Sequence, residues 1–346
     1  MSSLGTGHGN GHNRYALLVL PAANRVYTRA SWELARSELA VFDHAVLGGR
    51  LRDIERCEIG GVPYVGFSAP GLEPRDAAFL ANLSSAHALF QVHGRLLEPV
   101  ELRPLDRFDD DLVSIQRYAG KTNERFTRLL LNVTILASAF GGELLDRRFR
   151  VLDPLCGRGT TLNQALMYGF DAAGMDLDGR DFDAYAQFIR TWLQHKRIKH
   201  RADVTTVRRD RRAVGRRLDV TLTADGIEIA MVNADTCRAL EFFRRRWFDV
   251  LVADLPYGVQ HGSRAGADLA RGPLELLARA LPVWAELLRP GGALGLAWNA
   301  HVASRAALCE ALAGAGLEVE DAEPYLGFRH RVDQAIERDV VVARRP

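Results

Sequence analysis

Residues 250–258 read VLVADLPYG, and this stretch carries the first evidence on the fold. The apolar run 250–253 predicts a buried β-strand, because a short continuous apolar run fits a strand that is covered on both faces. The run ends on a carboxylate, Asp254, which is followed by Leu255, Pro256 and Tyr257. Since Pro and Gly often follow a strand in a simple turn, two interpretations stay open: a surface turn, or a site at the carboxyl end of a parallel strand.

The sequence around this motif alternates between strand-like and helix-like segments from residue 112 onward. The candidate strands are FRVLD (149–153), DAAGMD (171–176), IEIAMVNAD (227–235), FDVLVAD (248–254) and GGALGLAW (291–298). Amphipathic stretches lie at 160–168, 181–196, 270–288 and 301–314, after an expected helix over 112–139 in which Gly120 is a candidate break. Such alternation predicts a doubly wound α/β domain with a mostly parallel sheet and helices on both faces.

Acidic residues stand at the ends of the predicted strands. Three strands end on Asp153, Asp176 and Asp254, and a fourth ends on Asn233 with Asp235 two residues later. Because the carboxyl ends of parallel strands share one edge, where ligands of such folds bind, we expect these side chains to lie together. Each acid taken alone also fits a solvated turn.

The N-terminal region follows a different order. It reads as a strand (15–20), a helix (31–46), two strands around Gly60-Gly61 (51–59 and 62–69), a helix (75–90) and an extended segment (91–100). This β-α-β-β-α-β order predicts a smaller α+β, ferredoxin-like domain over 14–98. Residues 1–13 are expected to be a disordered tail, and 99–111 a linker to the domain at 112–346.

Composition places limits on the partners. The formal net charge of the 346 residues is +2, so nucleic acid would have to be bound by a local basic patch. The four cysteines form no CxxC pair, which argues against a zinc site or a disulfide framework and favours a cytoplasmic location. No apolar run has membrane-spanning length, and we expect neither a metal nor a membrane partner. The oligomeric state is not predicted.

The turn after the first strand of the larger domain, DPLCGRGTT (153–161), predicts a ligand-binding loop. Its glycines permit a tight turn and close approach of the backbone, and the N–H groups at the start of the next helix face a ligand. The loop lacks the lysine of a P-loop and the GxGxxG pattern, and its carboxylate suits a cation better than a pyrophosphate. The residues predicted to bind a cofactor here are Asp153, Pro154, Cys156, Gly157, Gly159, Thr160 and Thr161.

Two later acids extend this prediction. Asp176 lies 23 residues after Asp153, the approximate spacing of a carboxylate that binds a ribose diol. Asp178 is a nearby rival, and Asp235 could accept a hydrogen bond from an adenine amino group.

With these motifs in order, residues 112–346 resemble class I S-adenosylmethionine (SAM)-dependent methyltransferases. The resemblance lies in four motifs that occur in the order typical of that class: DPLCGRGT, GMD, NAD and DLPY. The last of them, DLPY, resembles the motif of the branch that methylates exocyclic amino groups of bases. YAGKTNERFTRLLLNVT, PYGVQHGSR and RHRVDQAIERDVVVA resemble the tRNA guanine-N2 methyltransferases of the guanosine-10 type, although Leu255 stands where those enzymes usually have Pro. The resemblance implies a seven-stranded Rossmann-like sheet, SAM as cofactor and tRNA as partner.

The same resemblance gives the DLPY motif a chemical role. Asp254 would accept one N–H of an amino group, and a carbonyl of Leu255 or Pro256 the other, which directs the nitrogen lone pair at the methyl group. Tyr257 would stack on a base swung out of its stack. Thr122, in the segment before the fold, would lie near the methionine end of the cofactor.

A basic stretch marks the predicted insertion 196–227. Residues 196–217 contain ten Lys or Arg and two Asp in a nearly neutral chain. A solvated charged face is the usual meaning of such a run, and contact with RNA phosphates is the alternative that we favour. The predicted RNA-binding residues are Lys121, Arg208, Arg209, Arg211, Arg212 and Arg264.

Two other functions remain open at this point. DLPY also suits a DNA adenine-N6 or cytosine-N4 methyltransferase, because all three acceptors are exocyclic amino groups. A non-catalytic RNA-binding protein that keeps the fold as a scaffold is a second alternative.

Overall fold

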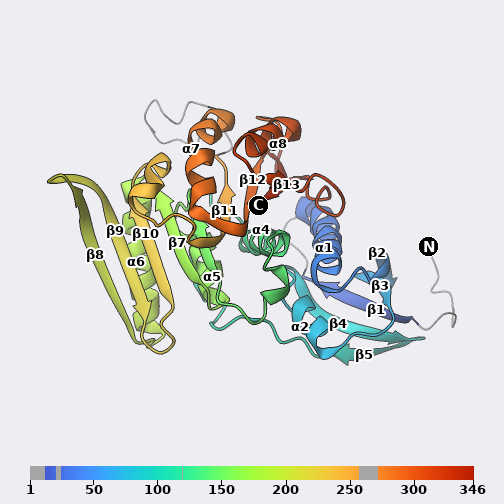
Figure 1. Cartoon of the computed structure of the whole chain (residues 1–346). Helices are drawn as coiled ribbons and strands as arrows, with labels where there is room; N and C mark the ends of the chain where they lie inside the picture. Colours follow the sequence, from blue (N-terminus) through green and yellow to red (C-terminus); the bar gives the residue numbers. More distant parts are fainter. Residues whose placement is uncertain (1–11, 21–24, 119, 257–271) are drawn as a thin grey trace.

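The computed structural model describes residues 12–20, 25–118, 120–256 and 272–346. Two β-sheets with their helices build the molecule, and Figure 1 shows the N-terminal sheet at one end and strands β8 and β9 at the other. Of the predicted tail 1–13, residues 1–11 lie outside the described residues, and Asn13 already begins the first strand.

The N-terminal sheet is antiparallel, with the strand order β2-β3-β1-β4-β5. Its elements are β1 (Asn13–Val19), α1 (Arg25–Val46), β2 (Arg52–Ile59), β3 (Val62–Ala69), α2 (Pro74–Leu80), β4 (Ala86–His93) and β5 (Leu96–Val100). The predicted β-α-β-β-α-β order is present over β1–β4, and β5 adds a fifth strand at the edge.

The predicted helix over 75–90 is wrong in its second half. The helix ends at Leu80, and Ala86–His93 pair with β1 instead. Both the N–H and the hydroxyl of Ser84 donate to the carboxylate of Glu38 in α1, which draws the chain away from the helical path. Tertiary contacts therefore override the local helix propensity of AHALF. The predicted single extended segment 91–100 is likewise a β4–β5 hairpin that turns at residues 94–95.

Residues 101–110 form no helix or strand, and the predicted helix over 112–139 is divided into two helices on either side of Gly120, its candidate break. α3 (Asp111–Ser114) is short, and α4 (Glu124–Ala137) begins where the side chain of Asn123 accepts hydrogen bonds from the N–H groups of Arg125 and Phe126. Asn is a favoured helix cap because its side-chain oxygen pairs with otherwise unbonded N–H groups.

The described part of the second sheet has ten strands, in the order β13-β15-β12-β11-β6-β7-β10-β9-β8, with β14 paired to β15. The elements are β6 (Arg150–Asp153), α5 (Thr160–Met167), β7 (Asp171–Asp176), α6 (Gly179–His195), β8 (His200–Arg209), β9 (Arg212–Leu222), β10 (Glu228–Asn233), β11 (Phe248–Asp254), α7 (Pro273–Leu287), β12 (Leu288–Asn299), α8 (Arg305–Gly314), β13 (Glu318–Val319), β14 (His330–Arg331) and β15 (Glu337–Arg344); the 3₁₀ helices are η1 (Gly141–Glu143) and η2 (Thr236–Glu241).

The parallel part of this sheet comprises β10, β7, β6, β11 and β12. Numbered along the chain, these strands have the order 3-2-1-4-5, the doubly wound arrangement in which the direction of winding reverses between β6 and β11. The expected count of seven strands is too low for the described sheet. The basic stretch adds the β8–β9 hairpin, and β14 is a further short strand.

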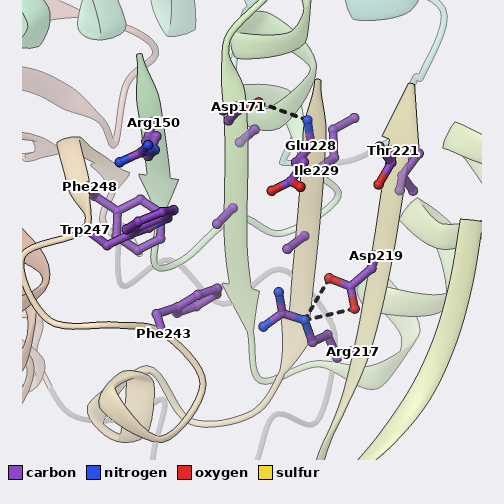
Figure 2. A pocket seen from close by; sticks show the side chains of 14 residues that line it. Arg150, Asp171, Arg217, Asp219, Thr221, Glu228, Ile229, Phe243, Trp247 and Phe248 are labelled. Carbon is purple, nitrogen blue, oxygen red and sulfur yellow. Dashed lines mark hydrogen bonds and ion pairs between the residues drawn. The ribbon is translucent and has the colours of Figure 1, made fainter. Parts of the chain in front are cut away.

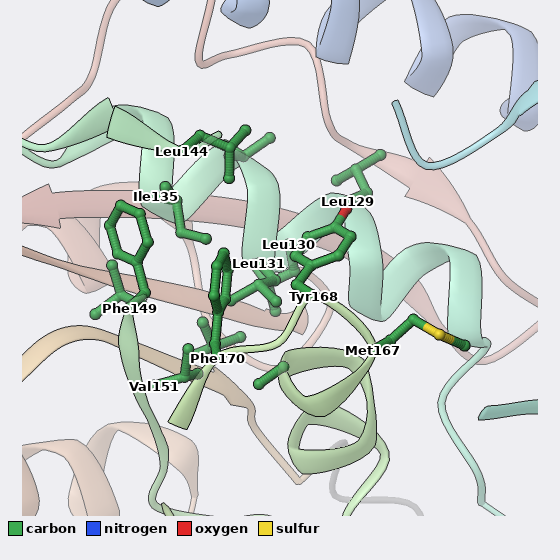
Figure 3. Close-up of a cluster of buried hydrophobic side chains, with 14 of the residues drawn as sticks. Leu129, Leu130, Leu131, Ile135, Leu144, Phe149, Val151, Met167, Tyr168 and Phe170 are labelled. Atoms are coloured by element: carbon green, nitrogen blue, oxygen red, sulfur yellow. The ribbon is translucent and has the colours of Figure 1, made fainter. Parts of the chain in front are cut away.

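Helices cover both faces of the second sheet. Buried side chains of α4, α5 and α6 belong to one apolar cluster, and those of α7, α8 and η2 belong to the other. Figure 3 shows the first cluster, in which Leu131 and Ile135 of α4 lie near Phe149, Val151 and Phe170. The same cluster includes residues of the N-terminal sheet such as Leu17 and Phe67, so the two sheets share one core.

A buried polar network also joins the two parts. Glu38 of α1 is fully buried and accepts from the Asn132 amide of α4 at 2.8 Å, while Tyr168 donates to Asn132 at 2.9 Å. Burial raises the pKa of Glu38, and hydrogen bonds from Ser84 and Asn132 oppose that shift. Because buried polar groups of this kind are costly to separate, α1 is held firmly against α4.

Candidate active site at the carboxyl edge of the sheet

Four polar residues end neighbouring strands at one edge of the sheet. Asp153, Asp176, Asn233 and Asp254 are the last residues of β6, β7, β10 and β11. Parallel pairing sets Asn233 beside Asp176 and Leu251 beside Leu152, so the strand ends lie at one edge, as the sequence predicted. Asp153 and Asp254 flank the point where the winding reverses, which is where doubly wound folds bind ligands.

The glycine-containing loop after β6 is tied to β7. The N–H of Cys156 donates to the carbonyl of Met175 at 2.8 Å, and the N–H of Gly157 donates to Asp176 Oδ2 at 2.8 Å. Gly159 has a φ of +77°, and a Cβ there would lie 2.4 Å from the ring of Tyr185. The glycine is therefore required both by its backbone conformation and by the close approach of α6. Helix α5 starts at the next residue.

Two of the strand-end acids, Asp153 and Asp176, have raised pKa values. Asp153 is 5% exposed, and burial raises its pKa to about 7, helped by the nearby charges of Asp176 and Asp254 and opposed by hydrogen bonds from Thr161 and the N–H of Leu155. Burial also raises the pKa of Asp176. A group that resists ionisation for these reasons gains from a cationic ligand, which offsets the repulsion.

Asp254 is held at its carboxylate by two side chains. Thr122 Oγ1 donates to Asp254 Oδ2 at 2.7 Å, and Arg338 Nη2 lies 3.5 Å from the same oxygen. The side chain of Leu255 is buried in the core, and its N–H donates to the carbonyl of Ala297 at 2.8 Å. The side chain of the second motif residue therefore serves packing. Pro256 is exposed, and Tyr257 lies outside the described residues.

Three residues around Asp254 were missed by the sequence reasoning: Arg338, Phe126 and His330. The guanidinium of Arg338 lies 4.2 Å from the ring centroid of Phe126, and the ring of Phe126 contacts that of His330 at 5.4 Å. Burial lowers the pKa of His330 to about 4, and its Nδ1 lies 2.8 Å from the carbonyl of Phe328. His330 is thus neutral at pH 7 and leaves the positive charge to Arg338.

This neutral histidine predicts an acid-sensitive fold. His330 titrates near pH 4 in the folded protein and near 6.5 when unfolded, so the unfolded state binds more protons between these values. The free energy of unfolding is then expected to fall as the pH decreases from about 6.5 to 4, by up to about 3 kcal/mol. His330→Gln should flatten this dependence in urea titrations at several pH values. His87→Gln, at an exposed position, is the control, and an unchanged slope in the His330 variant would contradict the prediction.

The segment before α4 lies against the glycine-containing loop. The hydroxyl of Tyr118 lies 3.3 Å from Thr160 Oγ1, and the guanidinium of Arg158 lies 4.7 Å from the centroid of the Tyr118 ring. Lys121, predicted to bind RNA, donates to the carbonyl of Val113 at 2.7 Å and lies 3.6 Å from Glu124. Thr122 was predicted near the cofactor, and the structure brings it to Asp254.

Polar and apolar groups follow β7 and β10 at the same edge. The Asn233 amide donates to the carbonyls of Asp176 and Leu177, at 3.0 Å in each case. Asp235 accepts from the N–H of Cys237 at 2.9 Å, and Arg279 Nη2 lies 3.5 Å from its other oxygen. The side chain of Leu177, which directly follows Asp176, is 61% exposed. Its position directly after Asp176 was the signal that the sequence offered.

The basic stretch forms the β8–β9 hairpin and extends the sheet. Arg216 pairs with Asn233 in the β9–β10 register, so the residues from 215 back to 208 continue past the end of β10. Asp210 and Arg211 both have positive φ at the tip, as a two-residue hairpin turn requires. The tip therefore projects from the edge that carries the strand-end acids. It presents four predicted RNA contacts on exposed side chains: Arg208, Arg209, Arg211 and Arg212.

These four arginines are not all alike. Arg209 donates to the carbonyl of Glu241 at 2.6 Å, which ties the hairpin to η2. Within the described residues, Arg208, Arg211 and Arg212 form no ion pair. The predicted contact Arg264 lies outside the described residues.

A separate cavity of about 310 Å³ lies on the face of the sheet, over β7, β9 and β10 (Figure 2). The guanidinium of Arg150 lies 3.8 Å from the ring centroid of Trp247, and Arg217 forms an ion pair with Asp219 at 2.8 Å. The lining includes none of the predicted site residues, so this cavity is distinct from the carboxyl edge.

The described residues show neither a metal-binding cluster nor a membrane-spanning helix. No group of three or more His, Cys, Asp or Glu side chains in this part of the chain could hold a metal ion. Among the same residues, every helix is too short or too polar to span a bilayer.

Comparison with known proteins gives a likeness to solved structures only. No model of a known protein family matches the sequence, and no curated protein is significantly similar to it.

The solved structures with similar folds include SAM-dependent methyltransferases. A TehB-like SAM-dependent methyltransferase from Corynebacterium glutamicum is 18% identical over 59% of this chain and 86% of that chain, with a TM-score of 0.36. An rRNA methylase from Streptococcus thermophilus is 11% identical over 66% and 99% of the two chains, with a TM-score of 0.37. SMU.1697c from Streptococcus mutans, solved with SAH, is 11% identical over 58% and 90%, with a TM-score of 0.35. Because these TM-scores are below 0.5, we argue the function from this chain's own residues.

Proposed function

We propose that this protein is a SAM-dependent methyltransferase that modifies an exocyclic amino group of a nucleobase, and that guanine N2 in tRNA is its acceptor. The observation that carries the proposal is the position of Asp254. It ends β11 at the point where the winding of the sheet reverses, across from the glycine-containing loop that follows Asp153. A carboxylate at that point can receive an amino group beside a bound cofactor.

The donor chemistry of the edge fits SAM, which supplies a methyl group on a cationic sulfonium. In the proposal, the crowded acids favour its positive charges, with Asp153 nearest the ammonium group. Asp176 receives the ribose hydroxyls, since a carboxylate that already accepts two N–H groups keeps lone pairs for more. The exposed side chain of Leu177 would pack against the adenine, and Asp235 would accept from its amino group. The cofactor would also be contacted by six residues of the loop: Pro154, Cys156, Gly157, Gly159, Thr160 and Thr161.

Asp254 then prepares the acceptor nitrogen. The lone pair of an exocyclic amino group is delocalised into the ring, which makes the nitrogen a weak nucleophile. An N–H bond to Asp254 and another to the carbonyl of Leu255 or Pro256 orient the nitrogen toward the methyl group, and orientation supplies much of the rate. As the C–N bond forms, the bond between the methyl group and the cofactor sulfur would break with its electron pair staying on sulfur. The nitrogen would lose one proton, which Asp254 would accept. Tyr257 is proposed to stack on the flipped base.

The β8–β9 hairpin supports a nucleic acid as substrate. Its tip places exposed arginines beyond the same edge, where they would bind phosphates while the target base enters the site. We propose the ferredoxin-like N-terminal domain, residues 14–98, as an accessory to this binding.

Asp176→Ala is expected to weaken binding of S-adenosylhomocysteine by about 10- to 100-fold, because a hydrogen bond to a charged group contributes about 1.5–3 kcal/mol. Calorimetric titration measures the affinity. Asp178→Ala is the matched control, because Asp178 lies two residues away and caps α6 through the N–H of Arg180. Equal losses in both variants would mean that the two acids act together or through the local fold. A loss confined to Asp178→Ala would assign the ribose hydroxyls to that rival acid, and unchanged affinity in Asp176→Ala would remove Asp176 from the site.

The activity itself is tested by incubating the protein with labelled SAM and total RNA or DNA, followed by nucleoside analysis. Labelled N2-methylguanosine in tRNA is the expected product. N6-methyladenine or N4-methylcytosine in DNA would favour the DNA enzyme instead. Binding of RNA without any methylated nucleoside would favour the non-catalytic RNA-binding protein.

A further inference from the structure

We propose that Thr122 and Arg338 are positioning residues, which fix the Asp254 carboxylate in the orientation that receives the acceptor amino group. The inference rests on the proposed function, and it deepens it by assigning a role to two side chains from distant parts of the chain. Thr122 precedes α4, and Arg338 lies in β15.

The first argument is that both contacts meet the same oxygen. The Thr122 hydroxyl donates to Asp254 Oδ2 at 2.7 Å, and Arg338 Nη2 lies 3.5 Å from it. One oxygen held from two directions fixes the rotamer and the plane of the carboxylate. The side chain is then oriented before a substrate arrives, which lowers the cost of reaching the reactive geometry.

The second argument is that Arg338 is itself immobilised. Its backbone pairs with Asn299 of β12 on one side and with His330 of β14 on the other. Its side chain is 5% exposed, and the guanidinium stacks on Phe126. Phe126 lies in the first turn of α4, so the same short segment supplies Thr122 and the ring that supports Arg338.

Helix α1 of the N-terminal part supports this cluster. Helix α1 packs against α4 and β14, and Ser37 of α1 donates to the carbonyl of Gly327 at 2.7 Å. A Cβ on Gly327 would lie 2.2 Å from that hydroxyl. Helix α1 therefore packs against the two elements that carry Phe126 and His330, the aromatic residues beside Arg338.

The competing interpretation is a structural ion pair that only stabilises β15. Arg128 provides a matched comparison, because it is also largely buried, pairs with Asp106 at 2.8 Å and lies 5.1 Å from the centroid of the Tyr168 ring. Arg128 reproduces the arginine–aromatic–carboxylate arrangement without contacting Asp254.

The test uses single-turnover methyl transfer by the full-length protein at saturating SAM, for the variants Thr122→Val, Thr122→Ser, Arg338→Met, Arg338→Lys and Arg128→Met. We expect rates about 10-fold lower for Thr122→Val and about 100-fold lower for Arg338→Met, because each loses a hydrogen bond or ion pair to a charged group. Thr122→Ser, which keeps the hydroxyl, should restore the rate to within about 3-fold. Arg338→Lys should recover part of it, and the Michaelis constant for RNA should change little.

Arg128→Met should lower thermal stability but keep the wild-type rate per folded molecule. If Arg338→Met loses no more activity per folded molecule than Arg128→Met, the structural interpretation holds and the proposal is overturned. If the wild-type protein itself transfers no methyl group, the proposed function fails. The positioning role is then tested separately, by crystal structures of the wild type and of the two variants. An Asp254 carboxylate that leaves its wild-type orientation in Thr122→Val and Arg338→Met supports the role, and an unmoved carboxylate overturns it.

Discussion

Replacing Asp254 is expected to reduce methyl transfer by about 100- to 10,000-fold, the range over which a positioned acid or base contributes to catalysis. The interaction of Asp254 with the amino group strengthens as positive charge grows on the nitrogen in the transition state. The loss should therefore appear in the turnover rate, with little change in the Michaelis constant. Binding of S-adenosylhomocysteine should be retained, because Asp254 is assigned to the acceptor.

The structure refines the choice of variant for this test. Asp254→Ala would remove the carboxylate that lies 3.5 Å from the buried guanidinium of Arg338, and the loss of an ion-pair partner lowers the stability of a fold. Asp254→Asn keeps an oxygen that can accept from Thr122, so it should fold more stably than the alanine variant. Its rate should lie between those of the wild type and Asp254→Ala, because the amide accepts one hydrogen bond but carries no charge.

The control for this experiment is Asp339→Asn. Asp339 is buried, lies in β15 next to Arg338, and forms an ion pair with Arg305 at 3.3 Å. The control should lose stability and keep its rate per folded molecule. Single-turnover rates at matched cofactor occupancy decide the outcome. If Asp254→Ala and Asp254→Asn keep most of the wild-type rate, the DLPY motif is a turn and the acceptor binds elsewhere.

The strand ends of the larger domain could be predicted because their signal is local. An apolar run that stops at Asp153, Asp176 or Asp254 marks both the strand and its end, and parallel pairing then brings the ends to one edge. The tight turn at Gly159 could also be predicted, because glycine is the residue that readily adopts such a backbone conformation. The close approach of the Tyr185 ring is a second reason for the glycine.

The contacts of Asp254 could not be predicted, because they depend on pairings between distant segments. Arg338 reaches Asp254 only because β15 is inserted between β12 and β14, and Thr122 precedes the motif by 132 positions. The false helix over 84–90 has the same origin, since Glu38 and β1 decide the conformation of that segment. The positive charge of the basic stretch could be predicted from its composition. The β8–β9 hairpin could not, because the turn at Asp210 and Arg211 contains no glycine.

Replacing the four arginines at the tip of the β8–β9 hairpin with alanine is expected to weaken RNA binding by about 100-fold at low salt. A phosphate contact releases counterions, and each lost contact lowers the slope of log affinity against log salt by about 0.7–0.9, so the slope should fall by about 3. Because the tip lies outside the core, the fold should be retained. Arg209 also donates to the carbonyl of Glu241 in η2, so the affinity for S-adenosylhomocysteine is measured in the same variant. The variant carries Arg208→Ala, Arg209→Ala, Arg211→Ala and Arg212→Ala.

The matched control removes the same charge from exposed arginines away from the tip and outside residues 14–98, through Arg103→Ala, Arg148→Ala, Arg201→Ala and Arg244→Ala. Fluorescence anisotropy with labelled tRNA at several salt concentrations measures both slopes. If the tip binds phosphates, the slope falls in the tip variant and stays near the wild-type value in the control. Equal slopes in the two variants would mean that RNA responds to the overall charge of the protein, and the hairpin would then be a solvated face of the sheet. The position of the tip favours the first result, since it projects past Asn233 at the edge where Asp254 would receive the base.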